Sequence, residues 1–108
     1  MITNNHAMPN MHVAFQEGFE NDTVIVWFDD DEVFRKEHLK TRMQTGKAAS
    51  FDLPGKTGPH ILRITVINRN THLNIPVTVS GTDLYVGISL TQDGHITHTL
   101  SNEPFRYA

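Results

Sequence analysis

The stretch LNIPVTVSGTDLYVGISL, residues Leu73–Leu90, alternates apolar and polar side chains on either side of SGTD. Successive side chains of a β-strand point to opposite faces, so this period of two predicts two strands with one buried face each. SGTD, at Ser80–Asp83, has the composition of a hairpin turn, because Gly, Asn and Asp tolerate positive φ. Pro76 cannot donate a ladder hydrogen bond, which predicts an edge strand or a bulge there.

The same period recurs along most of the chain. Alternating apolar positions occur around Val13 and Phe15, in Val24–Phe28, from Val33, in Ala49–Leu53, in Leu62–Val66 and in Ile96–Leu100. Turn-like segments separate them: LPGKTGP at Leu53–Pro59, NRNT at Asn68–Thr71 and QDG at Gln92–Gly94. Such spacing is typical of a β-sandwich or barrel, and two facing sheets need about eight strands to enclose a core. We therefore predict an all-β, two-sheet, mostly antiparallel sandwich of seven to eight strands, with one helical turn allowed around Lys40–Thr45.

The length and composition indicate one domain without covalent cross-links. A chain of 108 residues is most simply a single domain. Residues 1–10 are polar and are expected to form a flexible arm, with the sandwich over residues 11–108. The sequence has no cysteine, which excludes disulfides, Cys-based zinc sites and thiol chemistry.

Charge and hydropathy exclude two classes of partner. The net charge of −3 argues against a nucleic-acid-binding protein. No apolar run approaches the ~20 residues that a membrane span needs. The N-terminal residues lack the basic and apolar regions of a signal peptide, which favours the cytoplasm unless a signal has been removed.

Four consecutive acids, Asp29–Glu32, lie between apolar segments in VIVWFDDDEVFRKEHL, residues Val24–Leu39. Calcium needs six to eight converging oxygens, whereas consecutive side chains of an extended segment point in alternating directions. A tight turn favours Asp and must be solvated, so we interpret the acids as the bend of a hairpin. A metal site that uses Asp29 and Asp31 is the alternative.

The pattern does not favour an enzyme. The chain has seven histidines, but His95 and His98 of HITH fall on opposite faces of a strand, whereas zinc needs three or four converging ligands. No nucleophile elbow, phosphate-binding loop or dinucleotide fingerprint is present. We therefore assign no catalytic residue, no metal and no cofactor. A small metal-dependent hydrolase, built from histidines with Asp29–Asp31, is the remaining catalytic hypothesis.

Three apolar or aromatic residues are candidates for a binding surface. Ile25 and Trp27 lie opposite the face formed by Val24 and Val26, and Tyr85 lies opposite the apolar face of its own strand. Outward aromatic side chains suggest a protein-partner surface or carbohydrate stacking. Two other interpretations stay open: Trp27 belongs to the core and the faces are inverted, or loops cover it. Near the end of the chain, Phe105 and Tyr107 are expected to dock the tail onto the sheet.

Three segments between Val24 and Val79 resemble small β-sandwich modules of the prealbumin-like and carboxypeptidase-regulatory-like group. They are VIVWFDDDEVF, GKAASFDLPGKTGPHILRITV and IPVTV, and together they cover about half of the chain. Many immunoglobulin-like modules share this pattern of turns and core positions. The resemblance implies an immunoglobulin-like or prealbumin-like sandwich that acts in adhesion, carbohydrate contact or subunit association. It transfers no functional residue.

These observations lead to two functional hypotheses. The first is a non-catalytic interaction module that binds a protein partner or self-associates, for example as a homodimer, through an edge strand or the Trp27 surface. The second is a carbohydrate- or small-ligand-binding domain that uses Trp27 and Tyr85 as exposed aromatics.

Overall fold

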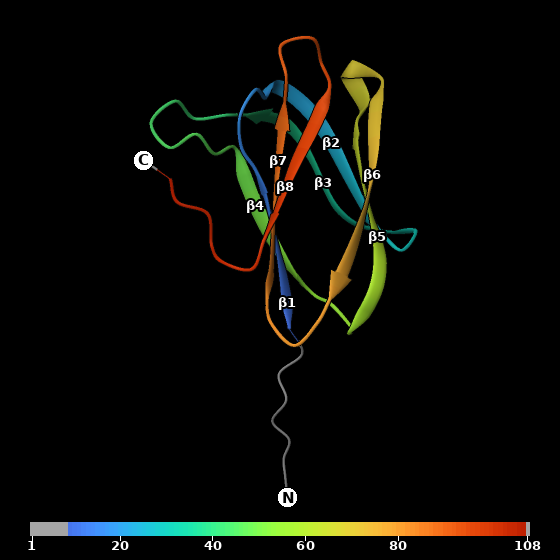
Figure 1. Cartoon of the computed structure of the whole chain (residues 1–108). Helices are drawn as coiled ribbons and strands as arrows, with labels where there is room; N and C mark the ends of the chain where they lie inside the picture. The colour runs from blue at the N-terminus through green and yellow to red at the C-terminus, as the bar shows by residue number, and fades with distance from the viewer. Residues whose placement is uncertain (1–8, 108) are drawn as a thin grey trace, which may run out of the picture.

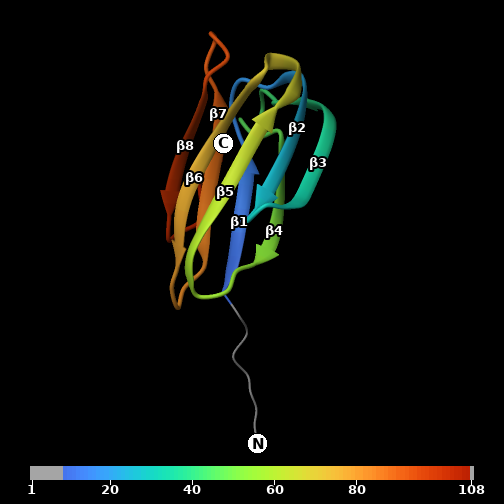
Figure 2. The same ribbon diagram turned by 90° about the vertical axis from the view of Figure 1, so that its right-hand side faces the viewer.

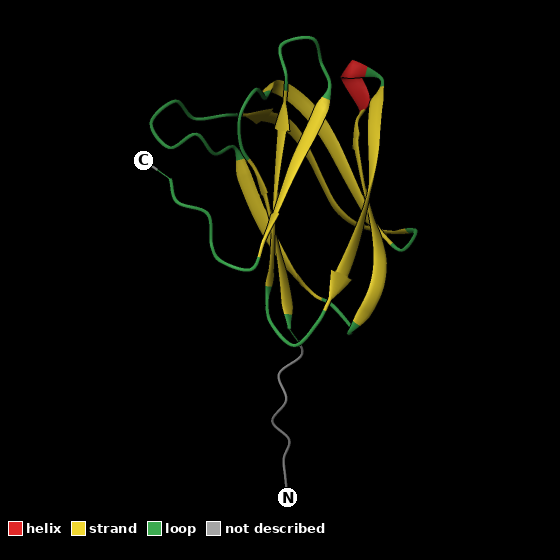
Figure 3. Cartoon of the chain, viewed as in Figure 1, coloured by secondary structure: helices red, strands yellow, loops and turns green. Residues whose placement is uncertain are grey.

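The computed structural model describes residues 9–107, which fold into two facing four-stranded sheets (Figures 1 and 3). The predicted all-β sandwich is confirmed. The flexible arm predicted over residues 1–10 lies almost wholly outside the described residues, and Asn10 already begins the first strand. The strands are β1 (Asn10–Phe15), β2 (Glu20–Phe28), β3 (Asp31–Lys40), β4 (Ala49–Pro54), β5 (Gly58–Val66), β6 (Thr71–Val79), β7 (Leu84–Leu90) and β8 (Ile96–Ser101).

Sheet A has the strand order β4-β1-β7-β8, and sheet B has the order β3-β2-β5-β6. Figure 2 looks onto sheet B, with sheet A behind it. All neighbouring strands are antiparallel except β1 and β7, which run parallel. Pro76 lies in β6, an edge strand of sheet B, as predicted. No helix among residues 9–107 is long and apolar enough to cross a membrane.

The core is made of the inward faces that the period of two predicts. Buried residues of sheet A face buried residues of sheet B; the central ones are Val13, Val86, Ile88, Val24, Val26, Leu62, Ile64 and Ile75. An aromatic cluster joins the sheets where β3 and β4 face each other. Phe34 of β3 stacks on Phe51 of β4 with ring centroids 4.3 Å apart, and Phe15 of β1 lies 5.6 Å from Phe34.

Three of the four predicted hairpin turns are confirmed. Asp29 and Asp30 join β2 to β3 with φ values of 49° and 72°, as a type I′ hairpin turn requires at both central residues. The acidic stretch is therefore a bend. A single 3-10 turn, η1 (Ile67–Arg69), followed by Asn70 at φ 53°, joins β5 to β6. Gly94, at φ 83°, lies in the turn between β7 and β8.

One prediction about the connections is wrong, and another is met by a single turn without a helix. SGTD does not form a hairpin, because it carries the chain from β6 of sheet B to β7 of sheet A. Turn composition identifies a reversal but not which strands it separates. Around Lys40–Thr45, where the sequence allows one helical turn, no helix forms: β3 runs to Lys40. The loop that follows makes a single turn, closed by a hydrogen bond of 2.8 Å from the Gly46 N–H to the Arg42 carbonyl oxygen and by an isolated bridge between Arg42 and Lys47.

Candidate interaction surfaces

Ile25 and Trp27 lie on the outward side of β2, but only one of them is accessible. The side chain of Ile25 is 4% exposed. Its strand is central in sheet B, and its register places Ile25 between Arg35 of β3 and Thr65 of β5. Long neighbouring side chains cover apolar surface at such positions. The expectation that Ile25 is exposed is therefore corrected, and Ile25 cannot contact a partner.

Trp27 is half-buried, and both a cationic side chain and exposed apolar side chains lie on the strands beside it. The guanidinium of Arg63, its cross-strand neighbour on β5, lies 5.7 Å from the ring centroid, within the range of a cation–π contact. On the two neighbouring strands, Val33 of β3 is 38% exposed and Ile61 of β5 is 46% exposed. The outward side of sheet B therefore carries the apolar and cationic groups that are typical of a contact surface.

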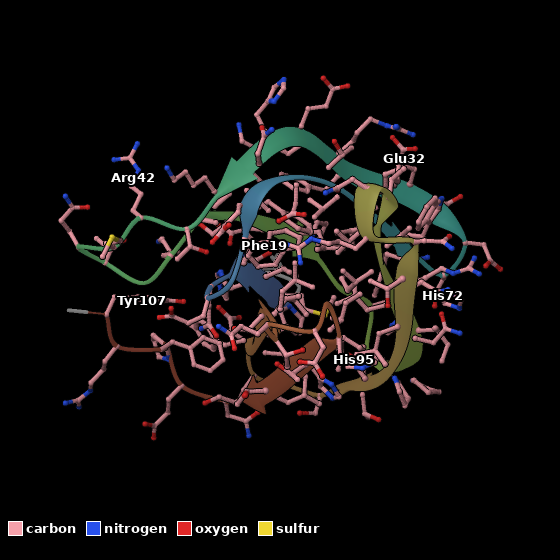
Figure 4. The ribbon with its side chains drawn as sticks, turned by 90° about the horizontal axis from the view of Figure 1, so that it is seen from above. Phe19, Glu32, Arg42, His72, His95 and Tyr107 are labelled. Atoms are coloured by element: carbon pink, nitrogen blue, oxygen red, sulfur yellow. The ribbon has the colours of Figure 1, made fainter. Side chains whose placement is uncertain are left out.

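An open depression of about 370 Å³ adjoins this surface near the β2–β3 turn. Its lining residues supply hydrogen-bonding groups around one apolar side chain: Asp29, Asp30, Arg63, Asn74 and Ile61. In Figure 4, Glu32 and His72 are labelled on the two edge strands that border sheet B, β3 and β6.

Tyr85 is half-buried on the outward side of sheet A, so it does not share a platform with Trp27 of sheet B. Its ring stacks on that of His12, with centroids 4.5 Å apart and planes 15° apart. The stacking uses one face of Tyr85 within the molecule. The sequence-based pairing of Trp27 with Tyr85 as one ligand surface is therefore not supported by their positions.

His12 is held between two carboxylates, an arrangement that the sequence analysis missed. Its Nδ1 lies 2.7 Å from Oδ1 of Asp52, and its Nε2 lies 2.9 Å from Oδ2 of Asp83. Burial alone would lower the pKa of His12, but the hydrogen bonds to Asp83 and Asp52 outweigh burial and raise it. Both ring nitrogens are occupied, so His12 ties β1 to β4 and to the β6–β7 connection and has no ring nitrogen free to act as a general base.

The acidic bend is part of a second structural contact of the same kind. Oδ2 of Asp29 lies 2.5 Å from Nδ1 of His60, and Oδ1 accepts a hydrogen bond from the Ile61 N–H. The other ring nitrogen of His60 lies 2.6 Å from the Lys56 carbonyl oxygen. The contact with Asp29 raises the pKa of His60 and lowers that of Asp29. Asp29 therefore anchors the turn, whereas Asp31 is exposed at the start of β3.

No group of three or more His, Cys, Asp or Glu in residues 9–107 could hold a metal ion. Two hollows, of about 510 and 630 Å³, flank the β3–β4 loop around Met43, which is 96% exposed. Neither hollow contains a residue that the sequence analysis selected.

The four edge strands differ in how they are protected against pairing with another chain. β3 carries charged side chains along its length and is irregular, with register shifts against β2 and a positive φ at His38. β6 has Pro76 at its centre, and β4 carries Asp52 and ends at Pro54. β8, ITHTLS, has no charged residue and no proline, and its register with β7 is regular. Charge, proline and bulges are the usual protections of an edge, so β8 is the unprotected one.

The predicted docking of the tail is confirmed for Tyr107, Phe105 is half-buried, and among residues 9–107 only β7 pairs with β8. The Tyr107 hydroxyl accepts a hydrogen bond of 3.0 Å from Gln16 Nε2, and Lys47 Nζ lies 5.1 Å from the Tyr107 ring centroid. The tail therefore runs past the outward side of sheet A, toward the β3–β4 loop (Figure 1). In Figure 2, β8 forms the left-hand margin of the sandwich.

Neither the family models nor the curated proteins searched with this chain contain a match.

Proposed function

We propose that this domain is a non-catalytic interaction module that forms a homodimer through the free edge of β8, within the prealbumin-like or immunoglobulin-like group of β-sandwiches. One observation carries the proposal: among the four edge strands of the described residues, β8 alone lacks a charge, a proline and a bulge. An unprotected edge is a template for another strand, and a second copy of the chain is always available to provide one.

The side chains of β8 agree with this role. Ile96 is half-buried against the core, but His98 and Leu100 on the same side of the strand are exposed, and Leu100 is 42% exposed. Pairing with another strand would cover this apolar surface. A non-catalytic role is supported by His12 and His60, whose ring nitrogens all have partners within the fold.

Sedimentation equilibrium over a range of protein concentrations tests the proposal. The expected result is a concentration-dependent dimer that Leu100→Lys weakens at least about tenfold, since a charge on an edge strand disfavours pairing. Ile61→Lys is the matched control, because Ile61 is similarly exposed, at 46%, but lies on sheet B. A monomer at all concentrations overturns the proposal. A dimer that Ile61→Lys disrupts and Leu100→Lys does not would place the contact on sheet B instead.

A second candidate function is carbohydrate or small-ligand binding beside Trp27. The depression lined by Asp29, Asp30, Arg63 and Asn74 favours it, because carboxylate, guanidinium and amide groups are hydrogen-bond partners for sugar hydroxyls. Trp27 is the only tryptophan, so its fluorescence reports on this site directly. Titration with a glycan panel is expected to change the emission, and an unchanged emission with every glycan rejects this second function.

A further inference from the structure

The sequence of β8 reads almost the same in both directions. Around His98 it is Ile-Thr-His-Thr-Leu, an apolar residue and a threonine on each side of one histidine. We propose that two copies pair their β8 strands antiparallel, with the two-fold axis at His98; this rests on the proposed function and specifies its register. His98 then faces His98 of the second copy, and each Ile96 faces a Leu100.

The backbone of β8 has the free groups that this register needs. On β7, the Ile88 carbonyl accepts a hydrogen bond of 2.7 Å from Gln16 N–H, and Leu90 N–H donates one of 2.9 Å to Glu17. These groups point toward β1. In an antiparallel ladder, the backbone N–H and C=O groups of two directly opposite residues either both point toward the partner strand or both point away from it. His98 and Ile96, which lie opposite Ile88 and Leu90, therefore direct theirs away from β7.

Backbone groups of successive residues point alternately to the two sides of a strand, so those of Leu100 also point away from β7. Ile96, His98 and Leu100 therefore present free N–H and C=O groups along the edge of β8. With the axis at His98, each of them lies opposite another such residue of the second copy, which allows about six hydrogen bonds. Moving the axis by one residue in either direction leaves only about four, because one of the three then lies opposite a residue outside the strand. The register centred on His98 is therefore the one with the most hydrogen bonds.

The side chains favour the same register. On the inward side, Ile96 lies opposite Leu100 at both ends, which covers the exposed part of Leu100. On the outward side, Thr97 lies opposite Thr99, and cross-strand apolar and threonine pairs stabilise antiparallel sheets. The strand order then becomes β4-β1-β7-β8 continued by β8-β7-β1-β4 of the second copy, which removes the unprotected edge from both molecules.

The chain after β8 turns away from this edge. The Ser101 hydroxyl donates to the Glu103 carbonyl oxygen at 2.8 Å and accepts from the Glu103 N–H at 3.0 Å, which closes a turn directly after the strand. Tyr107 then lies on a different side of the molecule from His95, which precedes β8 (Figure 4). Within residues 9–107, β8 pairs with β7 alone.

Opposite charges at position 98 test the axis. His98→Lys or His98→Glu alone puts two like charges opposite each other, and each variant is expected to weaken the dimer at least about tenfold. An equimolar mixture of the two is expected to form a Lys–Glu heterodimer and to restore association. His72→Lys and His72→Glu are the matched controls, because His72 is an exposed histidine on the edge strand β6, and neither is expected to change association.

Single cysteines give an independent measure of the register, because the native chain has none. His98→Cys is expected to form a disulfide-linked dimer on mild oxidation. Leu100→Cys alone is not, because the two copies of residue 100 would lie about 13 Å apart, beyond disulfide reach.

The failures of the two proposals are distinguishable. A native protein that is monomeric at every concentration overturns both the homodimer and its register. A native dimer that survives both His98 charge variants, or that is cross-linked by Leu100→Cys and not by His98→Cys, overturns the register alone. A charge mixture that stays monomeric while each control pair dimerises also contradicts the axis at His98.

Discussion

Oδ1 of Asp22, a fully buried carboxylate, lies 2.8 Å from Nε of Arg69. The same carboxylate accepts hydrogen bonds from the Asn68 side chain at 2.7 Å and from the Glu20 N–H at 2.7 Å. Burial alone would raise the pKa of Asp22, but these hydrogen bonds, that of Arg69 foremost, outweigh burial and hold it below the usual range. The contact fastens η1 to the start of β2.

We predict that Arg69→Ala lowers the free energy of unfolding by on the order of 3 kcal/mol, because it leaves a buried carboxylate without its cation. A carboxyl with a lowered pKa stabilises the fold at neutral pH, and that contribution is lost as the pH falls below about 4. Denaturant unfolding at pH 7 and at pH 3 is expected to show a large difference between wild type and variant at pH 7 and a smaller one at pH 3. Arg42→Ala, at an exposed arginine, is the control; equal losses in both variants would contradict the prediction.

The His60–Asp29 contact predicts a stability contribution confined to mildly acidic pH. His60 has a raised pKa, so its contribution is present below its ordinary value of 6.5 and is lost as the pH rises through the folded-state value. Asp29 has a lowered pKa, so its contribution is present above 3.8 and is lost as the pH falls through the folded-state value. His60→Gln is therefore expected to cost on the order of 1 kcal/mol near pH 5.5 and less at pH 9. His72→Gln, at an exposed histidine, should change little, and a His60→Gln cost that grows toward pH 9 would refute the assignment.

The two positive φ values of the acidic turn predict opposite effects of substitutions at Asp30. Asp-Gly is a preferred pair for a type I′ hairpin, and Asp29 already makes the contacts that fix the turn. Asp30→Gly is expected to raise the free energy of unfolding by up to about 1 kcal/mol, since glycine adopts the left-handed backbone conformation without the steric strain that a Cβ causes. Asp30→Val is expected to lower it, because β-branched residues avoid positive φ. Thermal unfolding measures both, and destabilisation by Asp30→Gly would be inconsistent with this turn.

Gly18, in the connection between β1 and β2, lies in close contact with the backbone at the end of β7. Its φ is 89°, and a Cβ added there would lie 2.0 Å from the Leu90 carbonyl oxygen. Gly18→Ala is therefore predicted to cost more than about 1 kcal/mol of stability. Gly81 is the control, because a Cβ added there meets nothing within 4 Å. Similar midpoints of urea unfolding for the two variants would disprove the steric argument.

Trp27 distinguishes a dimer formed through the edge strand β8 from a dimer formed through the outward side of sheet B, and the test needs no substitution in β8. Trp27 is on sheet B and β8 is in sheet A, so a dimer formed through β8 leaves the surroundings of Trp27 unchanged. We predict that Trp27→Ala leaves the dimer dissociation constant unchanged within about twofold. The native emission spectrum is also expected to stay constant across the monomer–dimer transition. A concentration-dependent shift of the emission would point to the surface around Trp27.

Much of this fold follows from local pattern. The alternation of Val24 and Val26 with Ile25 and Trp27 correctly predicts which side chains of β2 face inward, because the pleat alternates with every residue. Composition also predicts the bend at Asp29 and Asp30. The alternation does not reveal that Ile25 is covered, since the covering side chains come from strands that are distant in the sequence.

The candidate surfaces depend on the arrangement of strands, and the sequence predicted them less well. Trp27 and Tyr85 have the same signature, an aromatic residue opposite an apolar face, yet they lie on opposite sides of the sandwich. The contacts of His12 join residues 40 and 71 positions apart, and no local period encodes such a separation. The symmetry of Ile96–Leu100 is visible in the sequence, but its meaning depends on β8 being an edge strand.

The sequence by itself determined the class of fold, the inward side of most strands and the positions of most turns, because these depend on interactions between residues close together along the chain. Only the tertiary structure decided the strand order, the burial of Ile25, the partners of Asp22 and His12, and the exposure of β8. Those properties depend on which strands become neighbours, and strand order is selected by the packing of the whole core, to which every strand contributes at once.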